Sequence, residues 1–332
     1  MSRHSLAALS VVLMLVACEG TSGAGTKSTQ VGLKSPHARG YHHMFTTDHG
    51  VLLYGGETAP PRGGGNLLGD VWIYRKTTGW TARSTIGQKD GLTGYDARSA
   101  RMVAFVDEEG QFKTLNENWV YDPVADSWQQ RPLGSRPDEL AGGELAYDSE
   151  SDRLILFSRL GDTWAYDLDT DTWKLMNPTT GPSARDWGAM DYDPKSDRII
   201  LFGGGISDQG QSDTWAYDYN HNSWHELKPA TSPPARMYPA MAFDPTTNRM
   251  VVFGGLPTWS GQALGDTWAF DLTHDTWVEL SPAKGPSARA RHAIAYDIET
   301  RSIVLFGGGD DAFAFKSDTW IYDPVGNSWT KA

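Results

Sequence analysis

The sequence predicts an all-β protein, a six-bladed β-propeller with four antiparallel strands in each blade. Two observations predict this fold: tryptophans recur in pairs at a fixed period, and each repeat holds four short apolar runs separated by turn residues. Twelve of the 14 tryptophans form six pairs with a spacing of nine residues, or eight in the first pair. The pairs are Trp72/Trp80, Trp119/Trp128, Trp164/Trp173, Trp215/Trp224, Trp268/Trp277 and Trp320/Trp329. One unit of about 50 residues is therefore repeated six times.

The first strand of each unit is predicted to be buried on both faces. In the fourth unit, Met190 and Tyr192 lie on one side of an expected strand over 188–192, and Ala189 lies on the other. The fifth and sixth units repeat this alternation of large and small apolar residues, with Met241/Phe243 against Ala240/Ala242 and Ile294/Tyr296 against Ala293/Ala295. Such a strand fits the inner edge of a sheet that is wedged between two neighbouring sheets.

The other three strands of a unit follow in a constant order. In the fourth unit the second strand, over 198–202, ends at Gly203-Gly204, the third contains Asp-Thr-Trp-Ala-Tyr, and the fourth begins at the second tryptophan. The turns between first and second strands and between third and fourth strands are short and rich in Asp, Asn, Pro and Ser, which favour Asx turns and hairpins. Each unit is therefore a predicted meander, and six meanders form a propeller.

The two ends of the repeat array predict how the ring closes. The array begins with an innermost strand and ends with an outermost one, so closure does not require a strand shared between the ends. Residues 30–33 could add a strand to one edge.

The segment 161–173, GDTWAYDLDTDTW, is predicted to be architecture rather than a ligand site. It lacks the sixth-position glycine and the terminal glutamate of an EF-hand loop, and it also lacks the glycine of a sialidase Asp box. Its tryptophans recur in all six units, and its aspartates fit turn chemistry.

The diglycine after the second strand, the aromatic residue near the end of the third and the tryptophan that opens the fourth resemble the kelch repeat. The resemblance covers residues 35–332 and implies kelch-type blades. Two units depart from it, because Val106-Asp107 and Ser158-Arg159 stand in place of the diglycine. These two blades are expected to pack less closely.

The first residues predict export and lipid anchoring. Residues 1–17 read as a signal peptide, and Leu15-Val16-Ala17-Cys18 matches the lipobox, so the N-terminus resembles that of bacterial lipoproteins. Cys18 would be acylated and would hold the protein on the cell envelope, at the outer membrane or the cell surface. Residues 18–34 would form a flexible tether to the propeller over 35–332. An ordinary signal peptide is the alternative.

Charge and cysteine content exclude several classes of function. The formal net charge is −12, which disfavours binding to nucleic acid. Cys18 is the only cysteine, so the fold is expected to stand without disulfides or thiolate metal sites. No cofactor is predicted, and a monomer is expected.

Function is expected in the long connections between second and third strands, because loops on a rigid scaffold commonly carry binding sites. These connections cover residues 57–69, 107–116, 205–212, 256–265 and 309–317. Trp259 lies in one of them, and Trp187 precedes an inner strand; both are outside the six pairs. A local hydrophobic plug is the alternative role for these two tryptophans.

An arginine precedes the inner strand in four units, at Arg39, Arg185, Arg236 and Arg289. Two residues later come Tyr41, Trp187, Tyr238 and Arg291. A ring of guanidinium groups at the channel mouth could bind a carboxylate or an acidic sugar. The predicted ligand-binding residues are therefore Arg39, Arg185, Arg236, Arg289, Trp187, Tyr238 and Trp259. The alternative is that the arginine belongs to the repeat and bonds loop carbonyls.

Two groups of residues have side chains that can bind metal ions, but no metal site is predicted from either group. His42, His43 and His292 are expected to meet where the last blade adjoins the first. Glu144, Asp148 and Asp152 have a spacing similar to that of the iron ligands of kelch nitrile-specifier proteins, in which the third ligand is histidine.

Two functions of different class remain open. The first is a lipid-anchored module that binds a protein or a glycan through the long-loop face. The alternative, implied by the kelch resemblance, is a carbohydrate enzyme such as a sialic acid mutarotase, with Glu57, Asp310 or Asp311 as acid or base. Galactose oxidase chemistry is excluded because its cofactor needs a cysteine crosslinked to tyrosine, and Cys18 is in the lipobox. Binding is favoured because no specific catalytic constellation is visible.

Overall fold

The computed structural model describes residues 34–58, 65–107, 116–132, 134–137, 140, 142–310, 312 and 314–332. The predicted signal peptide, Cys18, almost all of the tether and Asp311 lie outside these residues. The described residues form strands and turns without a helix, and so contain no helix able to cross a bilayer.

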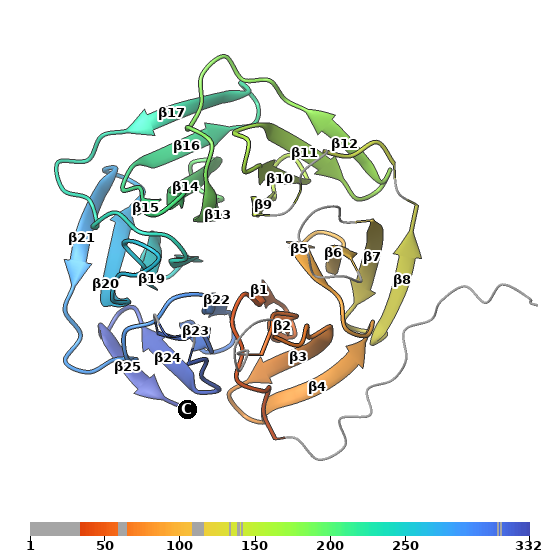
Figure 1. The fold of residues 1–332 in the computed structure, drawn as a ribbon, viewed down its shortest axis with the longest axis horizontal. Helices are drawn as coiled ribbons and strands as arrows, with labels where there is room; N and C mark the ends of the chain where they lie inside the picture. Colours follow the sequence, from red (N-terminus) through yellow and green to blue (C-terminus); the bar gives the residue numbers. More distant parts are fainter. Residues whose placement is uncertain are drawn as a thin grey trace, which may run out of the picture.

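Six antiparallel sheets are arranged radially around a central channel, as predicted (Figure 1). Blade 1 contains β1 (His43–Thr47), β2 (Gly50–Tyr54), β3 (Asp70–Arg75) and β4 (Gly79–Thr85). Blade 2 contains β5 (Asp90–Asp96), β6 (Arg101–Asp107), β7 (Glu117–Asp122) and β8 (Ser127–Arg131). Blade 3 contains β9 (Glu144–Asp148), β10 (Arg153–Phe157), β11 (Thr163–Asp167) and β12 (Thr172–Leu175).

The second half of the ring repeats the order with one addition. Blade 4 contains β13 (Asp186–Asp193), β14 (Arg198–Ile206), β16 (Thr214–Asp218) and β17 (Ser223–Leu227), and the short β15 (Gln209–Gly210) pairs with β14. Blade 5 contains β18 (Ala240–Asp244), β19 (Arg249–Gly255), β20 (Leu264–Asp271) and β21 (Thr276–Leu280). Blade 6 contains β22 (Ala293–Asp297), β23 (Ser302–Phe306), β24 (Thr319–Asp323) and β25 (Ser328–Lys331).

The large and small faces of the inner strands explain how neighbouring blades pack. Ile294 and Tyr296 of β22 share one core cluster with Ala240 and Ala242 of β18. The large face of one blade therefore fills the space above the small face of the preceding blade. Blade 4 departs at Asp191, which takes a small position and accepts a hydrogen bond from the backbone N of Phe243, at 2.7 Å.

The second tryptophan of each pair holds its blade to the preceding one. Trp224 Nε1 donates to Thr163 Oγ1 of blade 3 at 2.8 Å, and Trp277 Nε1 donates to Thr214 Oγ1 of blade 4 at 2.9 Å. Closure of the ring uses the same contact, because Trp80 Nε1 donates to Thr319 Oγ1 at 2.9 Å. Blades 1 and 6 are each built from one continuous segment, and the C-terminus lies beside blade 1 (Figure 1). Within the described residues the two ends therefore share no strand, as the prediction allows, and residues 30–33 lie outside the described part of the chain.

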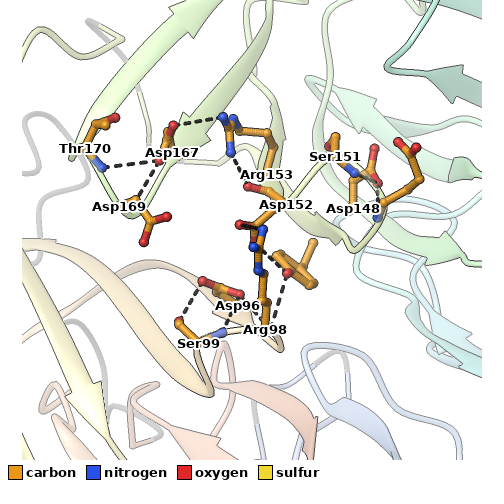
Figure 2. Close-up of polar contacts among 12 residues, drawn as sticks. Asp96, Arg98, Ser99, Asp148, Ser151, Asp152, Arg153, Asp167, Asp169 and Thr170 are labelled. Atoms are coloured by element: carbon orange, nitrogen blue, oxygen red, sulfur yellow. Dashed lines mark hydrogen bonds and ion pairs between the residues drawn. The ribbon is translucent and has the colours of Figure 1, made fainter.

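The acidic turns at the short-turn face are structural. Asp167 accepts from the backbone N of Asp169 at 2.9 Å and of Thr170 at 3.3 Å, and it pairs with Arg153 (Figure 2). Asp171 has φ 52° and accepts from the hydroxyl of Tyr166 at 2.8 Å. The segment 161–173 thus forms strand β11, its turn and the start of β12, as expected.

Candidate functional site

Four arginines that sequence analysis placed at the channel mouth are buried inside the blades. Each guanidinium forms a bidentate pair with an aspartate of its own blade and bonds a diglycine carbonyl: Arg236 reaches Asp266 at 2.7 and 2.8 Å and Gly254 O at 2.9 Å. The four pairs are Arg39–Asp70, Arg185–Asp213, Arg236–Asp266 and Arg289–Asp318. The arginines are at most 2% exposed. Their geometry matches the structural alternative.

Each of these aspartates also accepts a hydrogen bond from the first tryptophan of its blade, as Asp266 does from Trp268 Nε1 at 2.7 Å. Burial by itself would raise the pKa of Asp266, but the hydrogen bonds and charge of Arg236 outweigh it and hold this pKa below its usual range. In blade 2, Lys89 and Glu117 replace the pair at 2.7 Å. Blade 3 has the buried Leu140 at the arginine position.

The residue two positions after each arginine has a left-handed backbone. The φ angles of Tyr41, Trp187, Tyr238 and Arg291 are 61°, 58°, 54° and 61°. This conformation is costly for bulky residues, by about 1–3 kcal/mol each. Backbone contacts between blades hold it: Tyr41 N donates to Arg291 O at 3.0 Å, and Tyr238 N donates to Trp187 O at 2.8 Å.

These four side chains meet Trp259 in one cluster, which we call the aromatic cluster: Tyr41, Trp187, Tyr238, Trp259 and Arg291. Trp187 stacks on Tyr238 with ring centroids 4.9 Å apart, and Trp259 meets Trp187 edge to face at 4.8 Å. The Arg291 guanidinium lies 4.8 Å from the centre of the Tyr238 ring, and its Nε donates to the hydroxyl of Tyr41 at 2.7 Å. Cation–π attraction and packing therefore hold Arg291 in place.

Trp259 is positioned by the neighbouring blade. The hairpin formed by β14 and β15 carries Ser207 and Asp208, and Asp208 Oδ1 accepts from the backbone N of Trp259 at 2.7 Å. Trp259 Nε1 donates to the carbonyl of Ser207. The ring is consequently fixed over the channel mouth, although it belongs to a long loop.

A cavity of about 430 Å³ lies at the long-loop end of the channel, and we call it the long-loop cavity. The aromatic cluster walls one side. The other lining residues include four glycines and several ionisable groups from blades 1 to 4: Gly91, Gly142, Gly143, Gly188, His43, Glu57, Glu144, Arg159 and Asp186. None of the four buried arginines lines it. An apolar wall that faces a few polar groups is the usual composition of a small-molecule site.

Blade 3 supplies the wall that departs most from the repeat. Arg159 stands where blades 1, 4, 5 and 6 have the second glycine of the diglycine, and its Nε lies 3.2 Å from Asp186 Oδ1 of blade 4. Gly142 has the left-handed conformation, with φ 76°, at the position where blades 1, 4, 5 and 6 place an aromatic residue or Arg291 and blade 2 places Gly91. A Cβ there would lie 2.6 Å from Asp186 Oδ1, so a larger residue would have to displace the Asp186 side chain. The cavity therefore opens where blades 2 and 3 have a glycine in place of a large side chain.

Burial changes the protonation of the groups in the cavity. It raises the pKa of Glu144 well above the usual value, and the charge of Asp186 raises it further. Burial also raises the pKa of Glu57, against the opposing effect of Arg291. Burial lowers the pKa of His43 to about 4, and its Nε2 lies 3.1 Å from the Gly91 carbonyl, so the neutral ring donates there.

The histidines considered as metal ligands pack between blades. The rings of His42 and His292 meet Phe306 and Phe253 edge to face, at 5.7 and 5.4 Å. Burial lowers the pKa of His292 to about 3 and that of His42 far below its usual value. Across the described ranges, no three His, Cys, Asp or Glu residues are grouped to hold a metal ion.

The acidic triplet is divided between two ends of the molecule. Glu144 lines the cavity, whereas Asp148 and Asp152 are in the turn of blade 3 at the short-turn face (Figure 2). Asp148 accepts from the backbone N of Ser151 at 3.1 Å, and Asp152 pairs with Arg98 of blade 2 at 2.7 Å.

Three of the ligand-binding residues predicted from the sequence line the cavity, namely Trp187, Tyr238 and Trp259. Tyr41 and Arg291 were named as neighbours in register but were not assigned to the site, and Arg159 and the glycines were missed. The available signal was the loss of the diglycine at Ser158-Arg159. Asp310, a candidate acid or base, instead accepts from the backbone N of Ala312 and Ala314 in its own loop, at 3.1 and 3.0 Å.

The fold and the cavity define the class of protein, a β-propeller with a ligand-sized site at the mouth of its channel. Residues 140–332 match the family model described as the KLHDC2/KLHL20/DRC7 Kelch-repeats domain, which is more than half of the chain. The chain belongs to the kelch-repeat family.

Two curated relatives are similar to part of the chain. An F-box/kelch-repeat protein of Arabidopsis thaliana is 31% identical over 143 residues, which cover 38% of this chain and 29% of that protein. Human multiple epidermal growth factor-like domains protein 8 is 36% identical over 109 residues, which cover 31% of this chain and 4% of that protein. The chain thus spans less than a third of the length of these relatives.

Proposed function

We propose that this kelch-repeat propeller is an exported, lipid-anchored module that binds a protein or a glycan through the long-loop cavity. The observation that carries the proposal is the left-handed backbone of Tyr41, Trp187, Tyr238 and Arg291, which gathers four large side chains at one mouth of the channel. Strain of this kind persists where the surrounding structure maintains it, and it is concentrated at functional sites. Membership of the kelch family supports an interaction role in general.

The proposal is tested with the body from Ser35 onward as bait, in a pull-down from cell-envelope extracts and on a glycan array. Trp187→Ala should remove the ligand by opening the aromatic cluster, whereas Val124→Ala, at a 70% exposed position in the turn between β7 and β8, should keep it. Both variants must retain the wild-type circular dichroism spectrum. A ligand that binds all three proteins equally would refute a role for the cavity.

A carbohydrate enzyme such as a sialic acid mutarotase is the second candidate, and the Glu57 carboxyl favours it. Glu57 lines the cavity with a raised pKa and interacts with the charge of Arg291, as an acid or base would. The test is NMR exchange spectroscopy on the anomers of N-acetylneuraminic acid. Exchange that is faster with the wild type and lost in Glu57→Gln would support catalysis, and an unchanged rate would exclude it.

A further inference from the structure

The two carboxyl groups of Glu144 and Glu57 stand out among the polar groups of the cavity. Among the described residues, neither carboxyl has a hydrogen-bond partner, and the pKa of each is governed by burial and by a single nearby charge. Both side chains are partly exposed and line the cavity, so their carboxyl groups are accessible to whatever the cavity binds. The unpartnered carboxyl groups therefore point to a ligand that offers hydrogen-bonding groups.

The charges of the walls do not favour an ionic ligand. Arg291 is the cation of the aromatic cluster and already lies over Tyr238 and near Tyr41 and Trp259, where a cationic ligand would have to compete with it. An anionic ligand would meet Glu57, Glu144 and Asp186. Arg159 pairs with Asp186, so this positive charge is balanced within the wall.

The volume of the cavity and the composition of its walls further restrict the chemical class of the ligand. A volume of about 430 Å³ lies toward the small end of the range of roughly 300–1,000 Å³ that is usual for small ligands. Half-buried Trp187 and Trp259 offer apolar ring surface, and the carboxyl groups of Glu57 and Glu144 line the same cavity. A ligand that suits both walls has C–H groups on one face and hydroxyl groups at its rim.

We infer that the long-loop cavity holds a neutral sugar ring, packed against the indoles of Trp187 and Trp259, with hydroxyl groups bound by Glu144 and Glu57. This inference rests on the proposed binding function and specifies its ligand class. A hydroxyl group both donates and accepts, so it can bond a carboxyl group in either protonation state. A neutral ring also avoids the opposing charges of Arg291 and the acids.

The inference is tested by calorimetric titration of the body from Ser35 onward with matched sugars. Methyl glycosides and disaccharides of glucose, galactose and mannose are compared with the corresponding uronic acids and amino sugars, which keep the ring and add one charge. At least one neutral ligand should bind about tenfold more tightly than its charged counterparts. An acid or amine that binds as well as the neutral sugar, or the absence of binding by every sugar, would overturn the inference.

Variants separate a specific site from general affinity for sugars. Trp187→Ala and Glu144→Leu should each weaken binding of the neutral sugar about tenfold or more, while Val124→Ala should leave it unchanged. Equal binding by wild type and Trp187→Ala would overturn the inference. If no sugar binds and the pull-down still yields a protein that requires Trp187, the sugar fails and the proposed binding function stands.

A pH series gives an independent readout of Glu144. Well above the His43 pKa of about 4, wild-type affinity should fall with rising pH as Glu144 loses its proton, because a bound sugar excludes water from the cavity and so disfavours the charged carboxylate. Glu144→Gln should flatten the profile. Both proteins contain the other ionisable groups that line the cavity, which are His42, His292, Tyr41, Tyr238, Asp186, Arg159, Glu57 and Arg291. An identical pH dependence in both proteins would remove Glu144 from the site.

Discussion

The buried Arg–Asp pairs show how a residue that resembles a ligand-binding group can belong to the scaffold. Arg236 is fully buried, and its partner Asp266 also binds Trp268, so one carboxylate connects the linker before the blade with the third strand. An arginine outside the cavity carries no information about the ligand. The position two residues later, occupied by Tyr238, lines the cavity and does bear on the ligand.

Replacement of Arg236 by alanine should strongly destabilise the protein. It would leave Asp266 buried without its cation, which typically costs about 3–5 kcal/mol. Urea unfolding followed by tryptophan fluorescence measures the change. The double variant Arg236→Met/Asp266→Leu should lose less, because no charge is left buried; a single variant as stable as the wild type would show that the pair is dispensable.

Glu144→Gln should change the pH dependence of stability. The raised pKa means that the native state holds this proton more tightly than the unfolded chain, whose glutamates titrate near about 4.3. Wild-type stability therefore falls as pH rises from the unfolded to the folded pKa, and the loss then levels off. Glutamine does not titrate, so the variant should match the wild type at low pH and exceed it at higher pH in thermal melts. A constant difference at every pH would contradict the burial of an ionisable Glu144.

Much of the residue-level organisation is predictable where residues repeat, because one physical reason acts several times. The alternation of Ala240 and Met241 predicted a strand buried on both faces. The pairing of Arg236 with Asp266 was not predictable, since the partners are 30 residues apart and only the folded blade brings them together. Glu144 and Arg159 have no equivalent residue in the other repeats, so no periodic pattern identified them.

Among the elements, the hairpin of β14 and β15 has a role beyond its own blade. It extends blade 4 toward the next long loop and holds Trp259 through Asp208. The sequence showed a long connection at 205–212, but the contact to the following blade depends on the orientation of both loops. Local sequence does not contain that information.

Asp208→Ala should loosen the Trp259 loop without unfolding the blade. Loss of one hydrogen bond of about 0.5–1.5 kcal/mol corresponds to roughly two- to tenfold faster local opening. Hydrogen exchange of the peptide that covers residues 256–262 measures this change. Exchange in β20 should stay at the wild-type rate, and an unchanged rate in the loop would show that Trp259 is held by its ring contacts alone.

At the scale of the whole molecule, the ring closes with the contacts that also join its internal blades. Trp80 and Thr319 come from opposite ends of the propeller, yet their hydrogen bond equals that of Trp277 and Thr214 in kind and length. The six-bladed architecture was predictable because the repeat specifies this contact. The assignment of residues 1–17 to a signal peptide and of residues 18–34 to a lipid-anchored tether stays a prediction.

Thr319→Val and Thr214→Val form a matched pair that tests closure. Each removes one hydrogen bond to a tryptophan, so each should cost about 1 kcal/mol in the free energy of unfolding. Equal losses in urea titrations are expected. A clearly larger loss for Thr319→Val would show that the closing interface is weaker than the internal ones.

Cys18→Ala should release the protein from membranes. Acylation at Cys18 would supply the anchor, and the full sequence has a formal net charge of −12, which does not favour binding to anionic lipids. Fractionation of cells that express either form, with antibody detection, measures the distribution. A variant that still sediments with membranes would refute lipid anchoring.

The tryptophan contact has one direction around the ring, since blades 1, 4, 5 and 6 each donate to a threonine of the blade before them, and Trp128 of blade 2 donates to the Ser84 carbonyl of blade 1. It is a head-to-tail interface repeated within a single chain, related by approximate rotational symmetry. Such an interface does not by itself set the number of blades. That number follows from the angle between neighbouring sheets. Tandem duplication of one blade would copy both the tryptophan and the acceptor that the neighbouring blades require. Rings of this kind can therefore gain blades by unequal recombination, and each added blade would add new residues to the mouth of the channel.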